Sequence, residues 1–138
     1  MDYRLEVVQV PVSDVDRAKA FYAERAGFAV DHDTTVSDRM RIVQLTPPGS
    51  GCSIVIGTGL AEMEPGSVQG LQLVVTDIAA ARAELAGRGV DVSEVRVLGP
   101  AKMDGSKFIF FADPDGNGWG VLVFGGGGGA ACGPSFVW

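Results

Sequence analysis

Residues 10–28 read VPVSDVDRAKAFYAERAGF, and residues 73–89 read LVVTDIAAARAELAGRG. Each stretch starts as an apolar strand, passes through a Ser-Asp or Thr-Asp pair that can cap a helix, and closes at a glycine. The two stretches align at a constant offset, with Asp14 on Asp77 and Arg25 on Arg88. The chain is therefore predicted to repeat one structural unit.

Turn signals divide the rest of each unit into short apolar strands. Strands are expected at 5–12, 28–35, 39–46 and 52–57 in the first unit, and at 71–75, 91–97, 107–112 and 119–124 in the second. Each unit thus has the order βαβββ. Two such units predict an α+β fold in which paired βαβββ modules form a curved mixed sheet around a pocket, with the helices on the outer face. We expect one domain over residues 1–124, with units at about 5–57 and 69–124.

Composition excludes several functional classes. The 138 residues are 46% hydrophobic and carry 11 Lys and Arg against 17 Asp and Glu, a net charge of −6. This acidic balance argues against nucleic acid or an anionic membrane as the main partner. No run of about 18 apolar residues occurs and no secretory signal is expected, so a cytoplasmic location is predicted. Cys52 and Cys132 are expected to be reduced thiols.

Residues 125–138 form a glycine-rich C-terminal tail. The five consecutive glycines of 125–129 are predicted to be a flexible linker, because each glycine loses much backbone entropy on ordering. Beyond them, Phe136 and Trp138 either fold back over the mouth of the pocket or belong to a free chain end.

The first quoted stretch and residues 108–119, FIFFADPDGNGW, together resemble the vicinal oxygen chelate superfamily. That group contains glyoxalase I, bleomycin-resistance proteins, fosfomycin-resistance enzymes and extradiol dioxygenases. The resemblance runs from about residue 5 to residue 124, and it implies paired βαβββ modules, usually completed as a homodimer. By its residues alone, DPDGNG is typical of a hairpin turn with no catalytic task.

The metal sites of this superfamily supply a second comparison. The resemblance implies metal-binding side chains at the positions held here by Val7, Gly70 and Val123, none of which has a side-chain donor atom. A divalent metal needs several N, O or S ligands. We therefore expect no cofactor, with a divalent metal on non-standard ligands such as Gln9, Gln72 and Glu6 as the disfavoured alternative.

Alternation along the strands indicates which side chains face the pocket. Val7 and Gln9 share one strand face, and Gln72 is the repeat partner of Gln9. Both amides are predicted to hydrogen-bond a polar ligand, or else to be satisfied by backbone or water. The predicted ligand contacts are Gln9, Gln72, Val7, Gly70, Met103, Phe108, Trp119 and Val121, with Phe110 as a further candidate for the pocket wall. The single histidine, His32, is expected to face solvent.

Two functions of different class follow. The leading one is a metal-independent protein similar to the bleomycin-resistance branch, which sequesters a cationic or aromatic small organic ligand in a cleft at a dimer interface. The alternative is a metal-dependent glyoxalase-like lyase or isomerase, or a dioxygenase, with non-standard ligands. A folded protein with no small-molecule role is the third possibility. No catalytic residue is assigned, and enzymatic activity stays open at this point.

Overall fold

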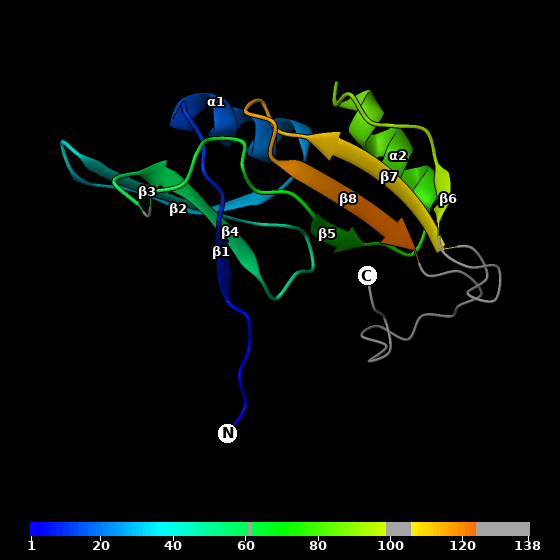
Figure 1. Ribbon diagram of the computed structural model, residues 1–138, viewed down its shortest axis with the longest axis horizontal. Helices are drawn as coiled ribbons and strands as arrows, with labels where there is room; N and C mark the ends of the chain where they lie inside the picture. The colour runs from blue at the N-terminus through cyan, green and yellow to red at the C-terminus, as the bar shows by residue number, and fades with distance from the viewer. Residues whose placement is uncertain (61, 99–105, 124–138) are drawn as a thin grey trace.

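The computed structural model describes residues 1–60, 62–98 and 106–123. It consists of two βαβββ units, and in Figure 1 the helices of both units lie on the same side of the sheets. The first unit contains β1 (Val7–Gln9), α1 (Val15–Ala20), η1 (Phe21–Arg25), β2 (Ala29–Ser37), β3 (Met40–Thr46) and β4 (Ser53–Thr58). The second contains β5 (Leu71–Val74), α2 (Ile78–Gly87), β6 (Arg96–Leu98), β7 (Ser106–Ala112) and β8 (Gly118–Val123). The predicted α+β fold is confirmed.

Each unit forms its own four-stranded mixed sheet, and both sheets have the same topology. The strand orders are β1-β4-β3-β2 and β5-β8-β7-β6. The first strand of each unit is parallel to the last, and the other pairings are antiparallel. The sequence repeat is thus a repeat of topology.

Helix boundaries follow the predicted caps. The carboxylate of Asp14 accepts a hydrogen bond from the backbone N–H of Arg17 at 3.0 Å, and that of Asp77 accepts from Ala80 at 3.0 Å. Each carboxylate satisfies a backbone N–H that the first helical turn leaves unpaired. The chain leaves the two helices through Gly27 and Gly89, whose φ angles of 84° and 88° suit glycine. The first helix is not uniform, since the π-helix η1 directly follows α1.

The core lies between the helices and the sheets, and the two units share it. Tyr22 and Phe28 of the first unit contact Trp119 of the second, with ring centroids 5.7 and 5.5 Å apart. All three side chains are buried. This aromatic cluster holds the two units together as one body.

Two predicted strands are longer than the observed ones. The strand expected at 91–97 is limited to β6, because the side chain of Ser93 takes a position in the ladder: its Oγ accepts the Phe110 N–H at 2.9 Å. The strand expected at 5–12 is limited to β1, since the segment before β1 extends away from the body (Figure 1) and Leu5 is 71% exposed. Met103 and the tail of residues 125–138, with the predicted role of Phe136 and Trp138, lie outside the described residues. Within the described ranges, the model has no helix long and apolar enough to span a membrane.

Candidate functional site

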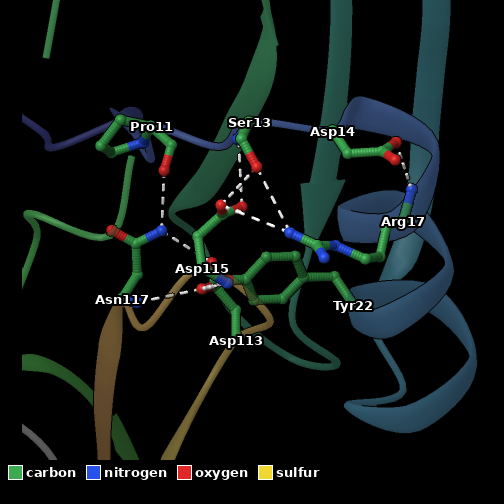
Figure 2. Close-up of polar contacts among 8 residues, drawn as sticks. All are labelled: Pro11, Ser13, Asp14, Arg17, Tyr22, Asp113, Asp115 and Asn117. Atoms are coloured by element: carbon green, nitrogen blue, oxygen red, sulfur yellow. Dashed lines mark hydrogen bonds and ion pairs between the residues drawn. The ribbon is translucent and has the colours of Figure 1, made fainter. Parts of the chain in front are cut away.

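The DPDGNG turn forms a buried polar junction at its first aspartate, shown in Figure 2. Asp113 is 5% exposed, and one of its carboxylate oxygens accepts the Tyr22 hydroxyl at 2.7 Å and the Asn117 amide at 2.8 Å. The other oxygen accepts two backbone N–H groups of the turn, those of Asp115 and Asn117, at 2.9 Å each. The Tyr22 hydroxyl also accepts the indole N–H of Trp119 at 3.0 Å. Burial, and then the nearby carboxylate of Asp113, raise the pKa of Tyr22 well above its usual value, so the hydroxyl stays a proton donor.

The same turn joins the two units and the segment between them. Asn117 is fully buried, donates to the carbonyl of Pro11 at 2.8 Å and accepts the N–H of Val68 at 3.1 Å. Asp115 accepts from the N–H and hydroxyl of Ser13 at 3.1 and 2.5 Å, and pairs with Arg17 at 3.4 Å. These polar groups are satisfied within the protein, so the turn acts as a structural clamp between the units.

A hollow of about 680 Å³ lies on the face of the second sheet that is turned away from the helices. We call it the aromatic hollow. Its lining includes Phe108 and Phe110, whose rings are parallel to within 3° and have centroids 5.9 Å apart. Gly120 leaves this surface open, since a Cβ there would already lie 3.5 Å from the Phe110 ring. The volume falls within the range typical of small-molecule sites.

Two glutamines of the aromatic hollow differ in their availability. The amide of Gln69 donates to the carbonyls of Gly66 and Gly116, at 3.1 and 2.8 Å. The side chain of Gln72 is exposed and has no hydrogen-bond partner within residues 1–60, 62–98 and 106–123. Gln72 can therefore offer both a donor and an acceptor to a ligand.

The structure brings together some of the predicted site residues. Gly70, Gln72, Phe108 and Trp119 all line the aromatic hollow, although Phe108 and Trp119 are only 3% and 4% exposed and Trp119 belongs mainly to the core. Val121 is buried on the helix-facing side of β8 and lines a different hollow, between the two units.

The first-unit candidates lie elsewhere. Gln9 lines a separate hollow of about 250 Å³, so the side chains of Gln9 and Gln72 do not line the same hollow within one chain. Val7 is 41% exposed on β1, and His32 is exposed on β2 as predicted. Gln69 and Gly120 escaped the sequence prediction. Gly120 could have been found from the alternation of side chains along β8, because residue 120 points to the opposite face of the sheet from Trp119.

The positions implied for metal ligands do not fit a metal site. Val123 packs against the core on the helix side, so it is not the residue of β8 that faces the aromatic hollow. Gly120 takes that place, and it also lacks a donor atom. Val7 and Gly70 have none either. Across the described residues, no group of three or more His, Cys, Asp or Glu side chains could hold a metal ion.

The fold defines a protein of two paired βαβββ modules with an aromatic hollow on the second sheet. Comparison with protein-family models identifies the family. Residues 4–121 match the Glyoxalase/Bleomycin resistance protein/Dioxygenase superfamily, and the chain belongs to that superfamily. The predicted resemblance is confirmed. A search of curated proteins finds no match.

Solved structures give closer comparisons. The antibiotic binding protein TnmS3 from Streptomyces sp. CB03234 is 34% identical, with a TM-score of 0.74 over 89% of this chain and 97% of its own. A glyoxalase/bleomycin resistance protein from the same organism is 35% identical, with a TM-score of 0.71 over 86% of this chain and 98% of its own. A superfamily member from Sphaerobacter thermophilus DSM 20745 is 28% identical, with a TM-score of 0.74 over 88% of this chain and 98% of its own.

Proposed function

We propose that this protein binds a planar aromatic small molecule in the aromatic hollow and sequesters it in the cytoplasm, without a metal and without changing it chemically. The observation that carries the proposal is the ring of Phe110, which is 36% exposed beside a glycine-lined surface and lies parallel to the buried ring of Phe108. Aromatic rings at such a surface favour offset stacking with a flat ligand. No Asp or Glu lines the aromatic hollow among the residues described, so the aromatic part of the expectation has more support than the cationic part.

The comparison with TnmS3 supports a binding role. That protein is described as antibiotic binding, and it is 34% identical to this chain over most of both lengths. Val7, Gly70 and Gly120 stand where a metal site of this superfamily would need ligands, and none has a side-chain donor atom. This supports ligand binding over metal-dependent chemistry. Fold similarity alone would not distinguish the two, because the superfamily includes both.

We further propose that the protein is a homodimer whose interface borders the hollow. Several large apolar side chains on the sheet faces turned away from the helices are exposed, with Val74 at 59%, Val7 at 41% and Phe110 at 36%. A second copy that covers them would remove this apolar surface from water. Light scattering should give twice the chain mass of 14.4 kDa. A monomer at micromolar concentration would contradict the dimer.

Fluorescence titration with 1-pyrenemethanol, a flat and uncharged probe, tests the binding function. The wild-type protein should bind it, and Gly120→Val should lose most of that affinity because the added side chain occupies the surface beside Phe110. Gly51→Val is the control, since the space around Gly51 is open and Gly51 does not line the aromatic hollow. Both variants should keep the wild-type melting temperature within a few degrees. Unchanged affinity in Gly120→Val would place the binding elsewhere.

A further inference from the structure

We propose that the aromatic hollow selects planar aromatic anions, and that Arg96 is the specificity-determining residue that pairs with the anionic group. This inference rests on the proposed function and specifies the ligand class for the same site. An aromatic carboxylate, sulfonate or acidic phenol has the required chemistry.

The strand register places Arg96 beside the hollow. Arg96 of β6 lies directly opposite Phe108 of β7 in an antiparallel pair. Directly opposed residues project from the same face of a sheet, so Arg96 lies on the face that carries Phe108 and Phe110. Its guanidinium carbon lies 5.9 Å from the centroid of the Phe110 ring. The attraction between a cation and a ring face holds the positive charge at the edge of the aromatic surface.

The charge of Arg96 is available to a ligand. Arg17, Arg41 and Arg82 each pair with an acidic side chain. Arg96 has no ion pair or hydrogen bond with a side chain anywhere in the described part of the protein. A guanidinium offers a planar set of N–H donors that suits carboxylate and sulfonate oxygens.

The described carboxylates next to the hollow in the sequence, and Glu94 two residues before Arg96, already have partners. Asp113, next to the lining residue Ala112, is buried in the polar junction, and Asp115, next to the lining residue Gly116, is bound to Ser13 and Arg17. Asp31 on the first sheet accepts hydrogen bonds from Gln44 and Thr46. The net charge of −6 acts over the whole molecule, but salt screens such fields within about 8 Å at physiological ionic strength. A guanidinium in direct contact with the ligand therefore outweighs it.

Gln72 and Arg96 lie at opposite edges of the aromatic surface. In the sheet order β5-β8-β7-β6, Gln72 stands on one edge strand and Arg96 on the other. Gln72 is opposite Gly120, which in turn is opposite Phe110. Three interstrand spacings separate the edge strands, about 14 Å. A molecule of several fused rings can lie across this surface with its anionic end at Arg96.

Three probes that share one ring system test the charge preference: 1-pyrenesulfonate, neutral 1-pyrenemethanol and the cation 1-pyrenemethylammonium. Titrated into the full chain at pH 7, the sulfonate should bind about five- to tenfold more tightly than the neutral probe, with the cation weakest. Arg96→Gln should remove this preference, so that the sulfonate and the neutral probe bind this variant with affinities within about twofold of each other. Arg96→Lys should keep part of it, because a lysine retains the charge without the planar donor set.

Lys107→Gln is the matched control. It removes one positive charge from the adjacent strand, but Lys107 lies opposite Val97 and so projects from the other face of the sheet. Its anion preference should equal that of the wild type. Equal binding of all three probes, a preference for the cation, or an anion preference that persists in Arg96→Gln would overturn the inference and leave the proposed function standing. Failure of all three probes to bind would overturn both.

Discussion

Arg25 and Arg88 cap the helix ends of each other's unit. Arg88 donates to the carbonyl of Arg25 at 2.6 Å and to that of Ala26 at 3.3 Å, and Arg25 donates to the carbonyl of Gly89 at 3.3 Å. The two arginines occupy equivalent positions in the repeat. A positive charge at the last carbonyls of a helix is favourable, because those carbonyls lack partners within the helix and carry the negative end of its dipole.

Replacing Arg88 tests this reciprocal capping. Arg88→Ala should lower the free energy of unfolding by about 1–2 kcal/mol, since it leaves two carbonyls unpaired. The effects of Arg25→Ala and Arg88→Ala should be non-additive in a double-mutant cycle measured by urea denaturation. Arg39→Ala, which removes an exposed arginine from a turn, is the control and should change stability by less than about 0.5 kcal/mol. A loss in Arg88→Ala no larger than in this control would contradict the capping role.

Tyr22→Phe tests the polar junction. The change removes a hydroxyl that both donates to Asp113 and accepts from Trp119, leaving two buried groups short of a partner. We expect a loss of about 1–3 kcal/mol in the free energy of unfolding. Tyr3→Phe is the control, because Tyr3 is 90% exposed, and it should be nearly neutral.

The raised pKa of Tyr22 also predicts a pH dependence at the alkaline end. Above about pH 10 the tyrosine ionises in the unfolded chain but stays protonated in the fold, so the unfolded state binds fewer protons. The contribution of Tyr22 to the free energy of unfolding should therefore be fully present below about pH 10 and should be lost as the pH rises further. Tyr22→Phe should lack this component, and identical alkaline slopes in the two proteins would count against the raised pKa.

Asp33 predicts a pH dependence at the acidic end. Hydrogen bonds from Arg41, and then from Lys19, lower the pKa of its carboxyl below the usual range. Stability from this pairing is present above the unfolded pKa of about 3.9 and is lost as pH falls below it. Because the pair is partly exposed, we expect a contribution of at most about 1 kcal/mol. Asp33→Asn should flatten the acid limb of a stability-against-pH curve, and an unchanged acid limb in this variant would contradict the lowered pKa.

Gly66→Ala tests how closely the segment between the units packs on the DPDGNG turn. Gly66 has a φ of +83°, and a Cβ there would lie 2.1 Å from the carbonyl oxygen of Asp115, so the backbone would have to move. Gly49 has a similar φ of +78° with open space around it. Gly49→Ala should cost about 1 kcal/mol for the strained φ alone, and Gly66→Ala should cost clearly more. Equal melting temperatures of Gly66→Ala and Gly49→Ala would show that the backbone of the DPDGNG turn moves aside at no cost, and would contradict the close packing.

The two predicted amides should differ in their effect on binding. Gln72→Leu removes the hydrogen-bonding group at the edge of the aromatic hollow, so it should weaken the binding of 1-pyrenemethanol by a few-fold. Gln9→Leu alters a separate hollow and should leave that affinity unchanged. Equal losses in both variants would mean that the two amides meet in one site, as they could across a dimer interface.

The sequence alone determined those features that depend on neighbouring residues. Asp14 and Asp77 cap helices through backbone groups three residues away, and Gly27 and Gly89 end them through their own φ angles. Phe108 and Phe110 were likewise predicted as candidates for the pocket wall. These are local constraints, so the repeat, the α+β class and the family could be predicted without a structure.

Tertiary structure decided everything that depends on how the two units pack. The bond between Tyr22 and Asp113 joins residues 91 positions apart, and the mutual capping of Arg25 and Arg88 spans 63. The register of β6 against β7 places Arg96 beside Phe110, and the separate sheets keep Gln9 away from Gln72. Alternation along β8 puts Val123 and Gly120 on opposite faces, but only the packing of the strand showed that Val123 faces the core and Gly120 faces the hollow. Such pairings arise from the packing of whole elements, and a local pattern of residues carries no information about which distant side chain it will meet.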